Sequence, residues 1–158
     1  MRSAAARLGS LVAAVGCGGA VVLTSLVAAS FRPGLWYEAL AKPPWTPPDW
    51  VFGPVWSVLY VAVGVAGWLL FTRDVGAYAR VLWVGQLVLN GLWSWLFFGL
   101  QRPGLALADI ALLLAAITAL LVLLASRQRL AFWLLVPYAA WVGYALTLNA
   151  GIVWLTSQ

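Results

Sequence analysis

Amide and aromatic side chains recur at helical spacing in three apolar stretches of the chain. Steps of three or four residues place side chains on one face of a helix. The three faces comprise Gly53, Trp56, Tyr60, Gly64 and Gly67, then Gln86, Asn90, Trp93 and Phe97, and last Pro137, Trp141, Ala145 and Leu148. Each face joins a large ring to small or amide side chains, so together they could enclose a flat, hydrophobic molecule. Ordinary helix packing is the alternative, because small residues let helices approach and polar side chains bond across them.

Three polar side chains lie within apolar stretches and need partners there. Gln86 and Asn90 carry amides, which are costly in an apolar medium unless they are hydrogen-bonded. They could clamp helices together, donate to a ligand, or do both. Asp109 is ionisable, and such a group inside a membrane is a functional candidate whose expected partners are other intramembrane polar groups. We expect Asp109 either to be neutral or to reach toward the interface near Arg102.

The composition excludes most familiar catalytic chemistry. The chain contains no histidine and a single cysteine, Cys17. Ser-His-Asp and Cys-His catalysis, histidine-held zinc and haem with an axial imidazole are therefore excluded. Four acidic residues supply no paired-carboxylate site unless distant segments converge, and no phosphate-binding loop or dinucleotide fingerprint is present. We expect no metal site and no cofactor, and enzymes of the common classes are disfavoured.

The spacing of the charged residues defines the elements that must position these side chains. The chain is 65% hydrophobic and 8% charged over 158 residues, whereas soluble domains carry roughly 25% charged residues. Long gaps between charges exceed the roughly 20 residues that a helix needs to cross a hydrocarbon core. The stretch "LALADIALLLAAITALLVLLA" is apolar all round, which favours a helix over an alternating barrel strand. We predict an all-α bundle of five transmembrane helices, at about 8–30, 51–72, 80–100, 104–126 and 130–155.

Charge asymmetry predicts the orientation of these helices. Six arginines are expected at one end of the bundle: Arg2, Arg7, Arg73, Arg80, Arg127 and Arg129. Arg32, Lys42 and Arg102 are expected at the other end. Basic residues favour the cytoplasmic side, so we predict a cytoplasmic N-terminus and an external C-terminus. The apolar run at the N-terminus resembles a signal peptide at first, but it continues to Ala29, so an uncleaved first helix is expected. No basic stripe interleaved with aromatics points to nucleic acid.

The segment between the first two predicted helices, 31–50, is rich in proline and tryptophan. Its final part reads "KPPWTPPDW", Lys42–Trp50. Proline fixes φ and removes a backbone donor, so this stretch is stiff and cannot be helix interior. Ordering a stiff segment costs less entropy, and the tryptophans offer wide contact areas. We predict that it forms a lid over a pocket on the non-cytoplasmic side.

Four stretches together resemble the TspO/MBR family. They are "WYEALAKPPWTPPDWVFGPVWSVLY", "GQLVLNGLWSWLFFG", "ALADIALLL" and "VPYAAWVGYALTLN". The resemblance covers nearly the whole chain after residue 30 and implies a single transmembrane domain, 1–158, of five helices. It further implies binding of porphyrins and other tetrapyrroles in a pocket between the helices, under the loop that joins the first two.

Site residues follow from the resemblance position by position. It implies Trp56, Asn90, Trp93, Trp141 and Ala145 as pocket residues, with Trp45 and Pro47 in the lid; Tyr60 joins them from the helical face described above. Asp109 matches an acidic position of the fourth helix in related sequences. Trp56 and Trp141 match tryptophans implicated in light-dependent porphyrin degradation by some bacterial members.

The chain also departs from the family pattern. Ala150 stands where animal members have a tyrosine of a proposed cholesterol-recognition pattern, and no basic residue follows it, so sterol binding through that pattern is in doubt. Pro44-Trp45 stands where a related bacterial pattern has two tryptophans, so the lid would contribute one ring fewer.

Three functions are therefore weighed for the chain. The leading expectation is a membrane protein that binds or transports porphyrins, with a stress-regulatory output. Light- or oxygen-dependent porphyrin breakdown is the alternative, and a purely structural membrane scaffold is the third.

Assembly and location carry expectations of their own. Small residues four apart permit close helix contacts; the pairs are Gly9/Ala13, Gly16/Ala20 and Ala139/Gly143. Family members are commonly dimers, so we expect a homodimer in the membrane. The composition, rich in Ala, Leu and Arg, suggests a bacterial cell membrane.

Overall fold

The computed structural model describes residues 2–31 and 33–158, and is helical with connecting segments. Arg32, which entered the charge argument above, lies outside the described residues. Five long helices form the bundle: α1 (Arg2–Ser30), α3 (Phe52–Thr72), α4 (Ala77–Ser94), α5 (Pro103–Arg127) and α6 (Arg129–Thr156). Within the described residues, five helices are long and apolar enough to cross a membrane. The predicted five-helix membrane bundle is therefore confirmed.

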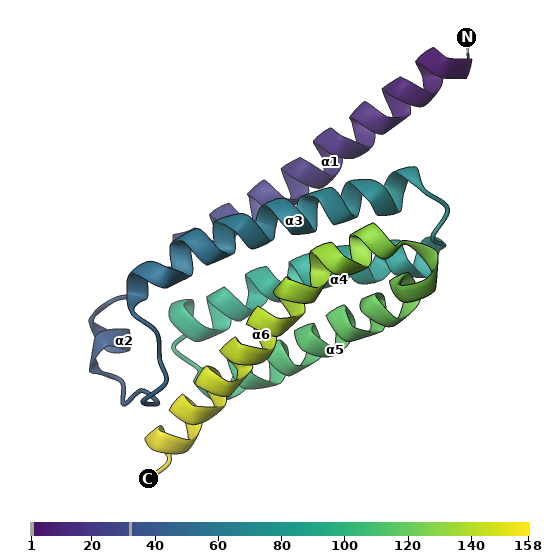
Figure 1. The fold of residues 1–158 in the computed structure, drawn as a ribbon. Helices are drawn as coiled ribbons and strands as arrows, with labels where there is room; N and C mark the ends of the chain where they lie inside the picture. The colour runs from purple at the N-terminus through teal and green to yellow at the C-terminus, as the bar shows by residue number, and fades with distance from the viewer. Residues whose placement is uncertain (1, 32) are drawn as a thin grey trace.

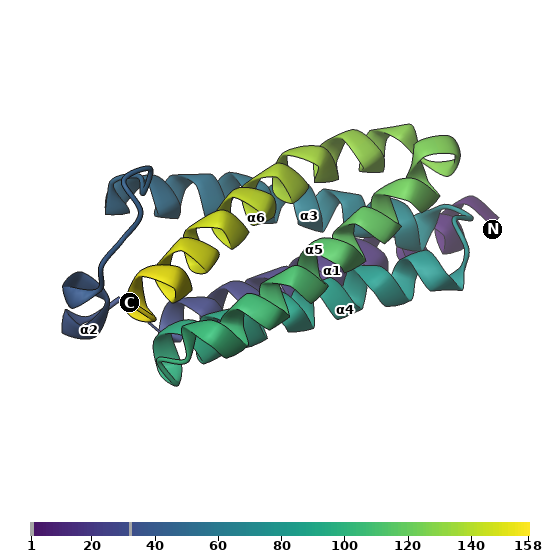
Figure 2. The same ribbon diagram turned by 90° about the horizontal axis from the view of Figure 1, so that it is seen from below.

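The five helices pack in a closed ring. Each contacts two neighbours, in the order α1, α3, α6, α5, α4 and back to α1, and α3 also touches α4. Figures 1 and 2 show the bundle from two directions, with α1 extending beyond its neighbours at its N-terminal end. The two chain ends lie at opposite ends of the bundle, as an odd number of crossings requires.

The predicted boundaries hold to within a few residues, with two informative differences. α1 begins at Arg2 rather than near residue 8, because the alanine-rich start continues the helix. The third predicted span ends in a short π-helix, Trp95–Gly99, in which the Leu100 N–H donates to the Trp95 carbonyl at 2.8 Å. Such π turns concentrate at functional sites.

The segment between α1 and α3 is not a plain loop. It contains a five-residue helix, α2 (Leu35–Ala39), and a 3₁₀ turn, η1 (Asp49–Val51). The prolines of "KPPWTPPDW" lie between them without helical structure, as predicted. Figure 1 shows this segment at the same end of the bundle as the C-terminus.

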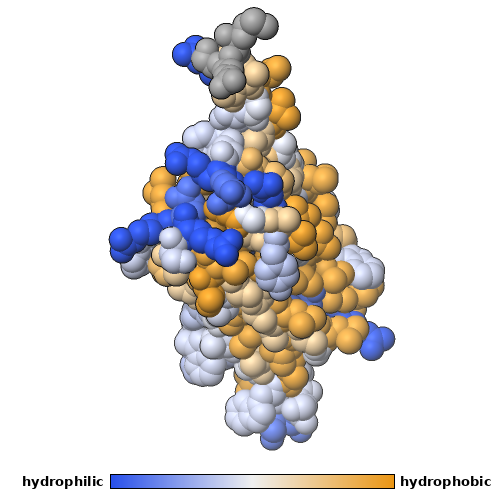
Figure 3. Space-filling view, turned by 90° about the vertical axis from the view of Figure 1, so that its right-hand side faces the viewer, coloured by the Kyte–Doolittle hydropathy of each residue, from blue (hydrophilic) through white to orange (hydrophobic). Residues whose placement is uncertain are grey.

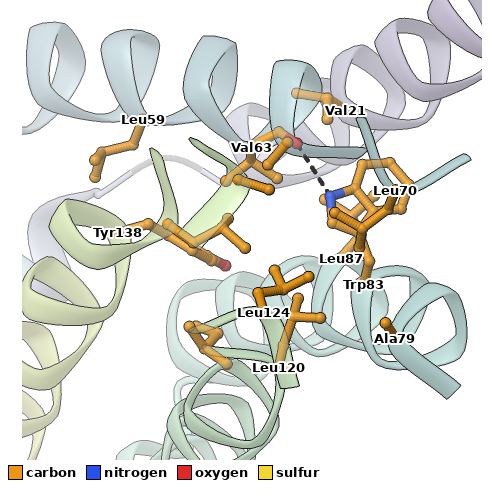
Figure 4. Close-up of a cluster of buried hydrophobic side chains, with 14 of the residues drawn as sticks. Val21, Leu59, Val63, Leu70, Ala79, Trp83, Leu87, Leu120, Leu124 and Tyr138 are labelled. Atoms are coloured by element: carbon orange, nitrogen blue, oxygen red, sulfur yellow. Dashed lines mark hydrogen bonds between the residues drawn. The ribbon is translucent and has the colours of Figure 1, made fainter. Parts of the chain in front are cut away.

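The hydrophobic core fills the half of the bundle near the α3–α4 and α5–α6 connections. Trp83 is 2% exposed, and its indole N–H donates to the Val63 carbonyl at 3.0 Å (Figure 4). Gly67 makes room for this ring, because a Cβ there would run into the six-membered part of the Trp83 indole. Leu70, Leu120 and Leu124 complete this dense region.

Polar residues gather at the end of the bundle where these connections lie. Figure 3 looks onto that end and shows a hydrophilic patch against predominantly hydrophobic sides. Arg80 fastens the α3–α4 connection, since its Nε donates to the Leu70 carbonyl at 3.0 Å and its guanidinium also reaches the Arg73 carbonyl. Arg127 Nη1 donates to the Val75 carbonyl at 3.4 Å, which ties the end of α5 to the same connection.

Candidate functional site

A cavity of about 510 Å³ occupies the half of the bundle opposite the dense core. Its wall comes from the C-terminal half of α1, from the segment before α3, and from α3, α4, the π-helix and α6. Helix α5 supplies none of the lining residues. The volume lies in the range of roughly 300–1,000 Å³ that small-molecule pockets occupy.

Aromatic rings line the cavity in two pairs, one on α3 and one on α4 with the π-helix. On α3, the ring centroids of Trp56 and Tyr60 lie 5.3 Å apart with a tilt of 31°. On α4 and the π-helix, Trp93 stacks on Phe97 at 5.3 Å and 26°. The π turn inserts an extra residue into the helix, so that Phe98 lines the cavity beside Phe97. Broad rings on two sides suit a flat, apolar ligand.

A chain of hydrogen bonds crosses three helices at the inner end of the cavity. The Tyr60 hydroxyl donates to Asn90 Oδ1 at 2.7 Å, and Asn90 Nδ2 donates to the Tyr138 hydroxyl at 3.1 Å. The Tyr138 hydroxyl in turn donates to Gln86 Oε1 at 2.7 Å. The amides of Gln86 and Asn90 therefore link α3, α4 and α6 as a clamp. Asn90 also lines the cavity, and one N–H of its amide is left for a ligand, since each NH₂ carries two donors.

A second amide, that of Asn149 on α6, joins Trp93 of α4 to the start of α5. Asn149 Oδ1 accepts from the Trp93 indole N–H at 3.1 Å, and its Nδ2 donates to the Pro103 carbonyl at 2.8 Å. The bond fixes the plane of the Trp93 ring against the cavity. The first residue of α5 is thereby attached to α6 at the same level.

The segment between α1 and α3, which we predicted to be a lid and call the lid segment, is fastened at one end of the bundle. Tyr37 of α2 is buried and meets Phe97 and Phe98 edge-on, at 6.2 and 5.5 Å between centroids. Burial raises the pKa of the Tyr37 phenol, and the nearby charge of Asp49 adds to this. The Tyr144 hydroxyl donates to the Trp45 carbonyl at 2.7 Å. Gly151 on α6 packs against the ring of Pro43, where a Cβ would not fit.

Five of the nine residues expected at the site line the cavity: Trp56, Tyr60, Asn90, Trp93 and Ala145. Trp45 and Pro47 belong to the lid segment, and the Trp45 ring is exposed. Trp141 lies outside the lining and meets Phe52 edge-on at 5.8 Å, while Phe52 itself lines the cavity. The Trp141 indole N–H is buried without an acceptor among the described residues.

Asp109 lies on α5, away from the cavity lining. Its side chain is buried, and among residues 2–31 and 33–158 its Oδ2 has no hydrogen-bond partner. The expected pairing with other intramembrane polar groups is therefore not seen at Oδ2.

Several lining residues were not predicted from the sequence. Ser25, Ala28 and Ala29 of α1 are small and carry no aromatic signal, yet they form one side of the cavity. Tyr138 belongs to the hydrogen-bond chain rather than to the lining, and it was not predicted either, because it follows the periodic Pro137 by one residue. No cluster of three or more potential metal ligands occurs in the described part of the chain.

Comparisons with known proteins agree on one family. The TspO/MBR family matches residues 10–155. The chain is 41% identical over 120 residues to the human "Translocator protein", covering 72% of this chain and 70% of that protein. It is 42% identical over 132 residues to the "Tryptophan-rich protein TspO" of Chlorobaculum tepidum, covering 78% and 82%. It is 34% identical over 128 residues to the "Protein CrtK" of Rhodobacter capsulatus, covering 78% and 80%.

Proposed function

The chain belongs to the TspO/MBR family, and we propose that this multi-pass membrane protein binds porphyrins and related tetrapyrroles in the cavity between α1, α3, α4 and α6. The observation that carries the proposal is the pair of aromatic walls, Trp56 with Tyr60 and Trp93 with Phe97, around a cavity of about 510 Å³. A tetrapyrrole is flat and largely apolar, so its faces match these walls.

The polar groups of the cavity fit the edge of such a ligand. The free N–H of the Asn90 amide can donate to a carboxylate or a ring nitrogen, and Ser94 and Asn149 also line the cavity. A few placed donors in an apolar pocket are the usual arrangement for fixing a ligand's orientation. Transport and a stress-regulatory output would both begin from this binding step.

Binding is tested by titrating metal-free protoporphyrin IX into the purified protein and following tryptophan fluorescence. We expect saturable quenching. Trp56→Ala should raise the dissociation constant roughly two- to tenfold, because aromatic contacts contribute about 0.5–1.5 kcal/mol. Trp133→Ala is the control, since Trp133 is exposed on α6 and lines no part of the cavity. Quenching without saturation, or equal effects of the two variants, would contradict the proposal.

Light-dependent porphyrin breakdown is a second candidate. Trp56 lines the cavity and contacts both Tyr60 and Tyr138, at 5.3 and 6.3 Å between centroids. Adjacent indole and phenol rings could accept and pass on an oxidising equivalent from a photoexcited ligand in the presence of oxygen. A bilin-like product that forms with purified protein, light and oxygen, and is lost with Trp56→Phe, would support this activity.

The remaining expectations concern orientation and assembly. We propose a cytoplasmic N-terminus, because Arg7, Arg73, Arg80, Arg127 and Arg129 lie at the end of the bundle opposite the lid. A homodimer in a bacterial cell membrane is proposed on the small-residue pairs, of which Ala139 and Gly143 lie on α6 beside α5. Cross-linking in native membranes tests the dimer.

A further inference from the structure

A second hollow lies on the outside of the bundle, against the wall of the first. This groove, about 560 Å³ in volume, runs between α1 and α3 and is lined mainly by small and aliphatic residues. Ser25, Ser57 and Tyr60 line both the groove and the cavity. The outward-facing side of the bundle and the candidate binding site are therefore separated here by three side chains.

The groove opens toward the surface that the bilayer covers. Val61 on its rim is 67% exposed, and Leu26, which lines the cavity, is also exposed. Gly18 borders open space in the groove, since a Cβ at that position would meet no other atom within 4 Å. Hydrocarbon chains of the bilayer would contact this opening directly.

No side-chain hydrogen bond joins α1 to α3 beside the shared residues, within the described chain. The Ser25 hydroxyl donates to the Val22 carbonyl and the Ser57 hydroxyl to the Gly53 carbonyl, each within its own helix. The bond that does join α1 to α3 is from the Trp68 indole N–H to Ser10 Oγ, at 3.0 Å. Ser10 lies 15 residues from Ser25, about 22 Å along the helix. The two helices are thus fastened at one end and held only by apolar contacts at the other.

The lid offers a less accessible route to the cavity. It is attached by the bond from the Tyr144 hydroxyl to the Trp45 carbonyl, by the tight contact of Pro43 with Gly151, and by the burial of Tyr37. Opening it would break a hydrogen bond and expose aromatic surface. Separating α1 from α3 near Ser25 breaks no side-chain hydrogen bond between the helices.

We propose that the α1–α3 groove is the membrane-side entrance to the cavity, through which a flat hydrophobic ligand passes directly between bilayer and site. This deepens the proposed function, on which it rests. The C-terminal half of α1 moves away from α3 about the Ser10–Trp68 end, and the ligand passes between Ser25 and Ser57. A ligand of this class is concentrated in the hydrocarbon, so the route spares it a return to water.

The entrance is tested with a matched pair of variants, Val61→Phe and Val88→Phe. Val61 is 67% exposed in the α1–α3 groove, and Val88 is 64% exposed in a separate groove between α1 and α4; neither lines the cavity. Each protein is placed in lipid nanodiscs, and binding of metal-free protoporphyrin IX already dissolved in the bilayer is followed by stopped-flow fluorescence. Gly18→Leu is a second variant that fills the same groove from α1.

An obstructed entrance slows arrival and departure equally, because both use one path. We expect Val61→Phe and Gly18→Leu to lower the association and dissociation rates by about tenfold each, which corresponds to a barrier higher by about 1.4 kcal/mol. The dissociation constant should stay within twofold, and Val88→Phe should leave both rates at the wild-type values.

Three results would overturn the inference. The first is that Val61→Phe and Gly18→Leu leave the association and dissociation rates unchanged. The second is that Val88→Phe slows both rates as much as Val61→Phe does. The third is that Val61→Phe and Gly18→Leu raise the dissociation constant while the association rate stays unchanged. Absence of any protoporphyrin binding to the wild-type protein would instead contradict the proposed function itself, so the two failures are distinguishable.

Discussion

At the scale of single residues, the amides do more than the sequence pattern could show. Gln86 and Asn90 were predicted as clamps or ligand donors, and the structure shows the clamp: both are bonded through Tyr138 to α6. Asn149, bonded to Trp93 and Pro103, has the same role at the other wall. These bonds make the cavity wall rigid, so a ligand would meet a preformed surface, although Gln86 Nε2 has no partner among the described residues.

The contact of Gly67 with Trp83 predicts a large effect of a single methyl group. Gly67→Ala should lower stability by about 1–3 kcal/mol, because overpacking a filled core displaces its neighbours, and the Trp83 indole is also held by Val63. Gly143→Ala is the control, since its Cβ would lie at an ordinary 3.9 Å from Leu114 Cδ2. Melting temperatures in detergent compare the two. Equal melting temperatures would contradict the packing seen here.

The absence of histidine from the chain gives a prediction for the relative affinities of haem and metal-free porphyrin. Haem bound here would lack its usual imidazole ligand, so binding should rest on the flat faces and the edge of the macrocycle. We expect metal-free protoporphyrin IX to bind at least as tightly as haem when both are titrated against tryptophan fluorescence. Binding of haem that is more than tenfold tighter would indicate an iron ligand and contradict this expectation.

At the scale of elements, the sequence predicted the long helices well and the lid only in outline. Gaps between charged residues located all five spans, because a membrane crossing needs a fixed length of apolar chain. Helix α2 and the π-helix were not predicted, since both depend on contacts made after folding: Tyr37 of α2 packs on Phe97 and Phe98 of the π-helix. The role of α1 in the cavity was missed for a related reason, because small residues become a wall only when aromatic rings face them.

The attachment of the lid to α6 gives a prediction for this element. Tyr144→Phe removes the hydrogen bond to the Trp45 carbonyl, and an intramolecular hydrogen bond typically contributes about 0.5–1.5 kcal/mol. Because proteolysis follows the population of the open form, cleavage within residues 40–50 should be a few times faster. Saturating protoporphyrin should slow cleavage in both proteins.

Tyr78→Phe is the matched control for the lid experiment. Tyr78 is exposed near the start of α4, at the opposite end of the bundle. The role given to the lid would be contradicted if Tyr144→Phe and Tyr78→Phe were cleaved at the same rate, or if the ligand gave no protection.

At the scale of the whole molecule, the two halves of the bundle differ in construction. The half near the α3–α4 and α5–α6 connections is filled by Trp83, Leu70 and Leu124, whereas the half under the lid is hollow. We therefore expect that the first half determines stability and that the second half holds the proposed binding site. Substitutions in the filled half should lower the melting temperature and leave ligand affinity unchanged. Substitutions in the hollow half should weaken ligand affinity and leave the melting temperature unchanged.

The orientation of the molecule is testable with single cysteines. Cys17 is buried in α1, so Cys17→Ser gives a background without a reactive thiol. In intact cells, a membrane-impermeant maleimide should label Ser157→Cys at the C-terminus, and should label Asp74→Cys in the α3–α4 connection only after lysis. The opposite pattern would show that the lid faces the cytoplasm.

The order of the helices around the ring has a consequence for how copies of the protein can associate in the membrane. Helix α5 stands across the ring from the seam between α1 and α3, and it contributes nothing to the cavity. Two copies that associate through α5 would each leave the α1–α3 groove in contact with lipid. Two copies that associate through α1 would cover one another's groove and so obstruct the proposed ligand entrance. Leu105, Leu112 and Val122 are exposed on α5, and copies that associated through this face would leave the proposed entrance uncovered.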